Sequence, residues 1–183
     1  MPEKQTDNAL LVEVLLNGAR IEGYSAQVEV RRRLSEVLNT PDEVLQLERA
    51  KATTGLGEPL DISSIVIEKW AILAAIPWET QEQNRQRALA TSMTGRAKTM
   101  QLPVVILSPP IVIAGTAHVA SGYGTSALRA DPSMFAHFFS VTDARITLED
   151  GTHLDAPVVL VNRDMVSAMA RTASEPARLR LIA

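Results

Sequence analysis

The sequence predicts a mainly β protein made of two tandem small β-barrels joined by a partly helical linker. Two observations lead to this fold class. A block of the first half recurs in the second half, and glycine-bearing turns divide each half into short segments rich in Val, Ile and Leu. About five short strands within about 65 residues, separated by such turns, are typical of a small and strongly bent barrel.

The repeat is clearest in GEPLDISSIVIEKWAI (57–72) and GTHLDAPVVLVNRDMV (151–166), which lie 94 positions apart. Identical residues stand at Ala50 and Ala144, Thr53 and Thr147, Gly57 and Gly151, Leu60 and Leu154, and Asp61 and Asp155. Farther upstream, the dipeptide at Gly23 matches the one at Gly122, with an offset of 99. Self-similarity of this kind indicates a duplicated domain, and the alternative is chance agreement between two strand–turn–strand units.

We place the first barrel at residues 9–76, the linker at 77–102, the second barrel at 103–174 and a tail or edge strand at 175–183. The linker is rich in Gln, Thr, Arg and Ala, which predicts a helix from about Glu79 to Met93. In the tail, ARLRLIA alternates Leu with Arg, as an added edge strand would.

Turn signals position the elements within each copy. Asn17-Gly18 lies between two strand-like runs and predicts a tight hairpin, because both residues tolerate positive φ. The segment RRRLSEVLN (31–39) predicts a turn or a helical stub. In the second copy, Asp150-Gly151 predicts another hairpin, and the glycines Gly115, Gly122 and Gly124 are expected to bend a strand.

The composition excludes several classes of function. The sequence contains no cysteine, which rules out disulfides, thiolate catalysis and cysteine-ligated zinc and fits a reducing, cytoplasmic compartment. No run of about 20 apolar residues is present, and acidic residues interrupt the N-terminal region, so we expect neither a membrane span nor a signal peptide. A net charge of −3 gives no global electrostatic reason to bind nucleic acid.

The segments VEVLLNGARIEGYS and RLSEVLNTPDEVLQLERAKA together resemble the first signature of Sm-like small β-barrels. The segments IVIEKWAIL and VLVNRDMV stand where such barrels carry a second, shorter signature. The resemblance covers about 120 residues in two halves and implies two Sm-like or SH3-like barrels. The pattern is also similar to small bacterial barrel domains to which no function is assigned.

The same resemblance implies candidate contacts for RNA or for a partner. RNA-binding Sm-like barrels present an Asp or Asn loop and later an Arg-Gly or Lys-His pair, which correspond here to Asn39, Lys69 and Arg163. Only the basic member of each later pair is kept, since the pairs read Glu-Lys and Asn-Arg. A base-stacking aromatic would be supplied in the second copy by Phe138 or Phe139.

Other polar residues allow two interpretations each. The run Arg31, Arg32, Arg33 either contacts phosphates or an acidic partner, or forms a solvated turn face beside Glu29 and Glu36. The repeated carboxylates Asp61 and Asp155 either form a paired site or bond backbone N–H groups in turns.

No residue set predicts a metal, a cofactor or a catalytic group. The three histidines, His118, His137 and His153, lack ligand spacing even when they are combined with Asp143 or Asp155. The segments GYGTSA and MTGRAKT lack the phosphate-loop pattern, and no serine-hydrolase elbow is present.

These observations favour a non-enzymatic tandem barrel protein that acts as an assembly or protein-interaction module. Partner docking or self-association would use edge strands, close to an apolar cluster of Trp70, Leu73, Ile76 and Trp78. The alternative is an Sm-like RNA-binding protein that uses the run 31–33 together with Lys69 and Arg163.

Overall fold

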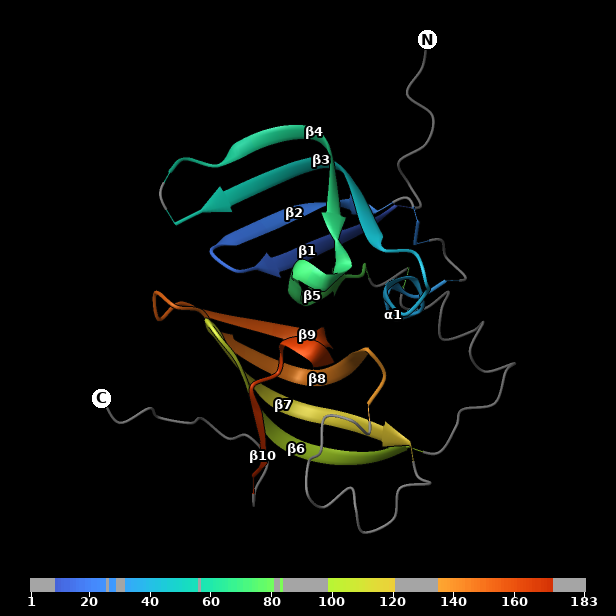
Figure 1. Cartoon of the computed structure of the whole chain (residues 1–183), viewed down its shortest axis with the longest axis vertical. Coiled ribbons are helices and arrows are strands. Elements are labelled where there is room, and N and C mark those ends of the chain that lie inside the picture. The colour runs from blue at the N-terminus through green and yellow to red at the C-terminus, as the bar shows by residue number, and fades with distance from the viewer. Residues whose placement is uncertain are drawn as a thin grey trace. The chain divides into compact units, whose positions relative to one another are not determined.

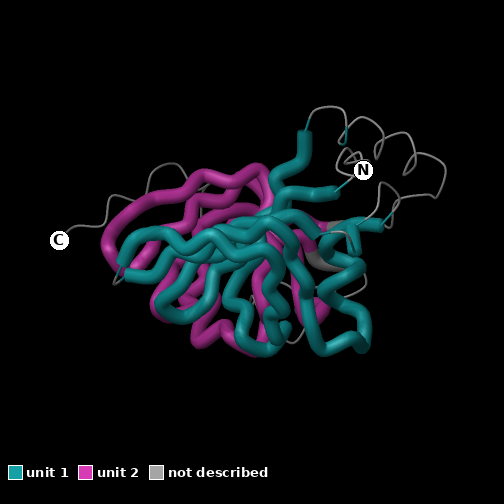
Figure 2. Tube along the Cα trace, turned by 90° about the horizontal axis from the view of Figure 1, so that it is seen from above, with its two compact units in different colours: residues 1–96 teal, residues 97–183 magenta. Residues whose placement is uncertain are grey.

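The computed structural model describes residues 9–25, 27–28, 32–55, 57–80, 83, 99–120 and 135–172. The fold is mainly β with antiparallel strands, which confirms the mainly β part of the prediction. The chain divides into two compact units, residues 1–96 and 97–183 (Figure 2).

The elements with described bounds in the first unit are five strands, a one-turn α-helix and a 3-10 helix (Figure 1). The elements are β1 (Leu10–Leu16), β2 (Ala19–Ser25), α1 (Leu34–Leu38), β3 (Val44–Thr54), β4 (Leu60–Glu68), the 3-10 helix η1 (Lys69–Ala71) and β5 (Ile72–Trp78). Within this unit the strand order is β5-β1-β2-β3-β4.

The second unit repeats this arrangement. The elements are β6 (Thr99–Ser108), β7 (Ile111–Ala120), β8 (Phe138–Thr147), β9 (His153–Asn162), the 3-10 helix η4 (Arg163–Met165) and β10 (Ala168–Arg171). The order β10-β6-β7-β8-β9 is that of the first unit, and a 3-10 helix again separates the fourth strand from the fifth.

Each unit buries its own row of aliphatic side chains. The core of the first unit includes Val12, Val14, Ile21, Leu45, Leu47 and Ile67, and that of the second includes Val104, Ile106, Ile113, Val141, Ile146 and Val159. The short helix α1 buries Leu34, Val37 and Leu38, so it contributes to the core of the first unit. Burial of such side chains supplies most of the free energy that favours folding.

The two predicted hairpins are confirmed. Gly18 has φ of 75° between paired residues Leu16 and Ala19, and Gly151 has φ of 81° in the turn between β8 and β9. In the second turn, the backbone N–H of Thr152 donates to the Asp150 carboxylate at 2.8 Å. The helical stub is also present, as α1.

Strands occupy both ends of the predicted linker, because β5 continues through Trp78 and β6 begins at Thr99. Most of the expected linker helix lies outside the described residues. So do Gly122, Gly124 and the tail beyond Thr172.

A β-bulge occurs at the same place in both units. Arg49 in β3 and Asp143 in β8 have φ of 48° and 50°, and the register of each strand with its predecessor shifts at this point. These residues are 94 positions apart, the offset of the sequence repeat. A bulge of this kind bends a strand and increases its twist.

A glycine lies opposite each bulge, and these two glycines correct one match of the predicted repeat between the two halves. A Cβ on Gly23 would lie 3.0 Å from Leu47 Cβ, and a Cβ on Gly115 would lie 2.6 Å from Val141 Cγ1. The structural counterpart of Gly23 is therefore Gly115, and the match with Gly122 was wrong. The shared Gly-Tyr dipeptide was a poorer guide than the close backbone approach that only glycine permits.

Candidate functional site

In each unit, the 3-10 helix at the corner after the fourth strand begins with a basic residue that was a predicted contact. In the first unit this residue is Lys69. Its ammonium donates to Val37 O at 2.7 Å, Thr40 Oγ1 at 3.1 Å and Thr40 O at 3.3 Å. Its backbone N–H donates to Glu43 O at 2.8 Å. Only 5% of the residue is exposed, so Lys69 ties the end of α1 and the start of β3 to η1.

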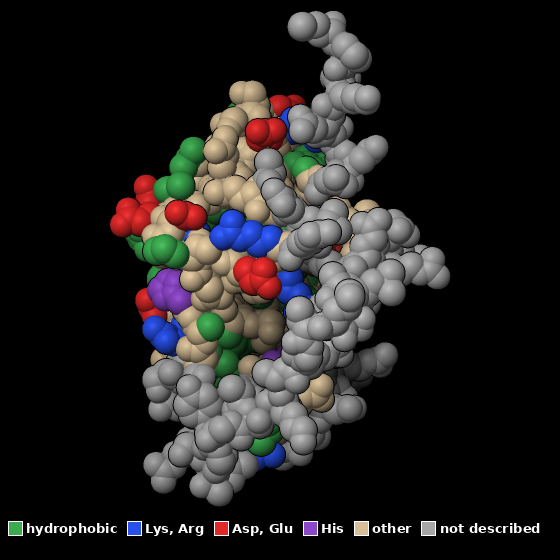
Figure 3. Space-filling model, turned by 90° about the vertical axis from the view of Figure 1, so that its right-hand side faces the viewer, with side chains coloured by type: hydrophobic (Ala, Val, Ile, Leu, Met, Phe, Trp, Pro, Cys, Tyr) green, Lys and Arg blue, Asp and Glu red, His purple; other side chains and the backbone are tan. Residues whose placement is uncertain are grey.

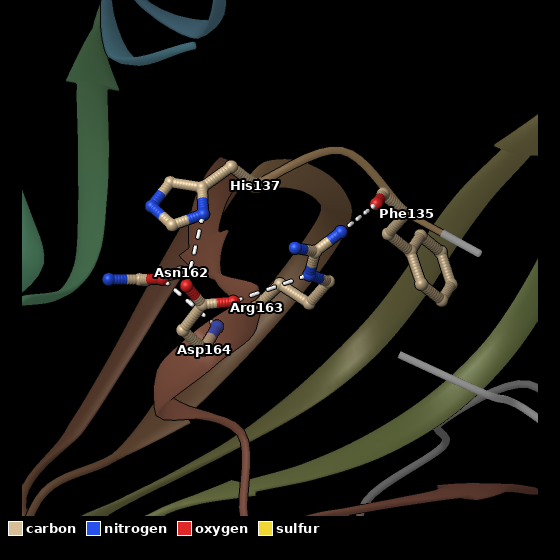
Figure 4. Close-up of polar contacts among 5 residues, drawn as sticks. All are labelled: Phe135, His137, Asn162, Arg163 and Asp164. Carbon is tan, nitrogen blue, oxygen red and sulfur yellow. Dashed lines mark hydrogen bonds and ion pairs between the residues drawn. The ribbon is translucent and has the colours of Figure 1, made fainter. Parts of the chain in front are cut away.

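Arg163 holds the corresponding corner of the second unit. Its backbone N–H donates to His137 O at 2.7 Å, and its Nη1 donates to Phe135 O at 3.0 Å (Figure 4). The backbone bonds of Lys69 and Arg163 are equivalent, since both their donors and their acceptors are 94 positions apart. Both basic side chains thus bind carbonyl groups of the segment that precedes the third strand.

His137 and Asp164 form an ion-pair contact at the same corner, with Nδ1 3.2 Å from Oδ2 (Figure 4). Asp164 is held from both sides, because its N–H donates to Asn162 Oδ1 at 3.1 Å and its Oδ1 lies 3.4 Å from Arg163 Nε. A carboxylate can orient a histidine for base catalysis, in which the ring takes a proton from a nucleophile or a substrate. The side-chain contacts of His137 in the described structure are with this carboxylate and the Phe138 ring.

The remaining predicted contact residues gather around α1. Arg32 and Arg33 are exposed before the helix, and Arg31 lies outside the described residues. Burial is the main cause that lowers the pKa of the Lys69 ammonium, Asp42 opposes it, and the nearby Arg32 lowers the pKa a little further. Asn39 donates from its amide to Ser35 O at 2.7 Å and ends the helix, so its side chain has a local structural partner.

The predicted base-stacking aromatics are buried. Phe138 and Phe139 belong to the core of the second unit, and Phe139 packs on Phe135 with ring centroids 4.3 Å apart. Stacking on bases requires an accessible ring face, so this expectation was wrong for the described conformation. Described lysine and arginine side chains on the face drawn in Figure 3 lie beside acidic ones rather than in one basic field.

The three histidines have separate partners. His118 Nε2 lies 3.0 Å from Thr142 Oγ1, and His153 Nδ1 lies 3.1 Å from Thr147 Oγ1. Among the described residues, no three His, Asp or Glu side chains are grouped closely enough to hold a metal ion. The described helices are all too short or too polar to cross a membrane.

The repeated aspartates lie in cross-strand pairs. Asp155 accepts two hydrogen bonds from Arg145, at 2.7 Å and 3.1 Å, and Asp61 is directly opposite Lys51 in the equivalent position. The Arg145 guanidinium lowers the pKa of the Asp155 carboxyl. For Asp155 the expected bond to a turn N–H was wrong, since the turn carboxylate is Asp150.

Strand β4 presents an open edge in the first unit. Among the described residues it pairs with β3 alone, and it carries two large exposed apolar residues, Leu60 at 61% and Val66 at 59%. Trp70, which follows in η1, is 72% exposed. The predicted apolar cluster is divided, because Leu73 and Ile76 are fully buried.

Sequence reasoning missed a buried carboxylate at the other side of this unit. Glu13 is 1% exposed, accepts a hydrogen bond from Trp78 Nε1 at 2.9 Å and forms an ion pair with Arg20 at 2.6 Å. A charged residue inside the apolar run of β1 was the available signal, because such a residue needs a partner when it is buried. These contacts also explain why Trp78 is not part of a free apolar surface.

Comparison of the chain with protein-family models, with curated proteins and with solved structures gives no match.

Proposed function

We propose that this protein is a non-enzymatic assembly module of two Sm-like or SH3-like β-barrels, in which an open strand edge takes up a protein partner. The shared strand order, the 3-10 helix before the last strand and the repeated bulge support the assignment of two equivalent barrels. A chain without cysteine suits the proposed cytoplasmic location.

The edge of β4 is the observation that carries this proposal. An edge strand exposes unpaired N–H and C=O groups, and soluble proteins usually protect such edges with charges, proline or a bulge. Within β4, the stretch Ile62–Ile67 contains neither a charge nor a proline. Long, apolar and uncharged edges are prone to uncontrolled pairing. A specific partner that covers this edge would remove that hazard.

The first test of the proposal is the mass of the full-length chain by sedimentation between about 1 and about 100 µM, where contacts of about 5 to 8 kcal/mol dissociate. We expect the wild-type chain to associate and Val66→Lys to weaken the association, because a lysine opposes an incoming strand. Thr53→Lys is the matched control, since Thr53 is exposed on β3, one strand away from the edge.

Thermal unfolding should show that both variants are folded. Two results together would overturn the proposal. The wild-type chain would stay monomeric, and it would capture no protein from its native cells whose binding is reduced by Val66→Lys.

The alternative function, RNA binding by the run 31–33 with Lys69 and Arg163, has less support. The side chains of Lys69 and Arg163 donate to carbonyl groups of their own units, which leaves Arg32 and Arg33 as the exposed described cations of this set. Titration with oligo(U) and oligo(A) at about 50 mM salt tests this function, because phosphate contacts strengthen as salt falls. Binding that is lost in Arg31→Glu/Arg33→Glu would restore RNA as the leading ligand.

A further inference from the structure

The inner face of the β4 edge determines what kind of strand can cover it. Opposed residues of neighbouring strands share a face, and Ile65 and Ile67 are opposite the buried Leu47 and Leu45. Ile67 is buried and Ile65 is half-buried, whereas Leu60 is largely exposed. A covering strand therefore needs apolar side chains on its inner face.

The outer face of the same edge carries exposed carboxylates near the end of β4. Glu68 is exposed at that end and Glu48 is exposed on β3 opposite Ser64, whereas Asp61 at the start of β4 is directly opposite the exposed Lys51. Val66 lies between Ser64 and Glu68 on this face, opposite Gln46. Basic side chains with long aliphatic stems would suit this surface, because the stems cover Val66 and the charges meet carboxylates.

One segment of the sequence has this pattern. In ARLRLIA (177–183), Arg178 and Arg180 alternate with Leu179 and Leu181, and the segment contains no acidic residue. In an extended strand, the two arginines would project from one face and the two leucines from the other.

We infer that the segment Ala177–Ala183 of a second copy of this chain adds to β4 as an antiparallel strand. This inference rests on the proposed function. The register that satisfies both faces sets Arg178 opposite Glu68, Leu179 opposite Ile67 and Leu181 opposite Ile65. Arg180 then lies over Val66.

This contact joins two different surfaces, so it is heterologous. Each copy offers one β4 edge and one segment 177–183, and every copy can therefore bind one neighbour at each surface. Heterologous contacts produce a closed ring when the rotation between copies closes, and an open chain when it does not.

Charge reversal in full-length chains tests this inference. Glu68→Arg and Arg178→Glu should each raise the dissociation constant about five- to tenfold, because each replaces an attraction with a repulsion. The double variant Glu68→Arg/Arg178→Glu should return it close to the wild-type value. Glu149→Arg is the control, since it makes the same charge change in the exposed turn between β8 and β9.

Mixing the two single variants tests whether the contact is between copies. The β4 edge of the Glu68→Arg chain carries a new positive charge, and the segment 177–183 of the Arg178→Glu chain carries a new negative one. These two surfaces are complementary, so the two variants should form mixed dimers at concentrations where neither associates alone. An excess of a synthetic peptide with the sequence 177–183 should dissociate the wild-type assembly.

The outcomes separate this inference from the proposed function. If Val66→Lys blocks association but both charge reversals associate like the wild-type chain, the β4 edge is the docking site and the segment 177–183 is not its occupant. If the mixture of single variants stays monomeric, contact with a second copy is refuted. If the wild-type chain and all variants are monomeric at every concentration, the self-association in the proposed function fails together with this inference.

Discussion

Lys69 should be the most informative residue to replace in the first unit. Its ammonium lies against one helix-end carbonyl and both oxygens of Thr40, and its own backbone N–H bonds Glu43 O. The change Lys69→Met keeps the length and much of the apolar stem of the side chain but removes all three side-chain donors. It therefore isolates the contribution of the ammonium to stability.

The expected cost follows from these contacts. A hydrogen bond from a charged donor is worth about 1.5–3 kcal/mol, and a buried acceptor left without a partner costs about 1–3 kcal/mol. The removal of a desolvated charge returns part of this cost. Thr40 Oγ1 also donates to Val37 O at 2.7 Å, so one acceptor keeps a partner. We expect Lys69→Met to lower the free energy of unfolding by about 2–4 kcal/mol.

Urea unfolding followed by circular dichroism measures this change, provided that the m-value stays constant. Lys51→Met is the matched control, because Lys51 is exposed on β3. A difference of less than about 0.5 kcal/mol between the two variants is within the usual range for surface substitutions. Such a result would refute the structural role that we assign to the ammonium.

The pH dependence of stability gives a second prediction for the same residue. Burial lowers the pKa of Lys69 from its ordinary 10.5, although Asp42 partly raises it. Between the lowered pKa and 10.5 the unfolded chain binds more protons, so the free energy of unfolding should rise with pH in that interval. Lys69→Met should lack this rise relative to Lys51→Met. An identical pH profile for the two variants would contradict the assigned cause.

Two further changes test the second unit. Gly115→Ala should destabilise it by about 1–3 kcal/mol in urea unfolding, because the new Cβ would meet a side-chain methyl at 2.6 Å and a backbone oxygen at 2.8 Å. Gly55→Ala should leave stability almost unchanged, because a Cβ added at Gly55 would have nothing within 4 Å. Equal losses of stability in the two variants would count against crowding at the bulge. Arg145→Met should raise the pKa of Asp155 toward its ordinary 3.8 in an NMR titration of the carboxyl carbon. The lowered pKa of Asp155 stabilises the wild-type fold at pH values above 3.8, and this stability is lost as the pH falls through the pKa of the folded state. The variant should gain less stability from Asp155 over this pH range.

Local signals were sufficient for the strands and turns. Gly18 and Gly151 occupy positions with positive φ, and glycine is the residue that adopts such angles without strain, so the turn dipeptides predicted both hairpins. Short segments rich in Val, Ile and Leu between glycine-bearing turns predicted the mainly β class. In both cases the determining interaction lies within a few residues of the signal.

The basic corners and the bulges depend on tertiary packing, and the sequence alone could not show them. Lys69 and Arg163 look like surface cations in the sequence, because nothing beside them reveals that α1 and the segment before β8 supply carbonyl acceptors. Arg49 and Asp143 adopt positive φ although neither is glycine, and each lies where the register with the preceding strand shifts. The repeat offset of 94 positions was the one available clue to these shared features.

The paired bulges also bear on how the two halves diverged. The residue at the left-handed position is an arginine in one half and an aspartate in the other, and their surroundings differ, because Arg49 stacks over the Tyr24 ring whereas the counterpart of Tyr24 is Thr116. Aspartate adopts this torsion more readily than most residues do, whereas arginine has no such preference. Under the predicted duplication, the backbone angle was kept while the side chain attached to it changed, so an alignment of the two halves by residue identity alone misses this shared position.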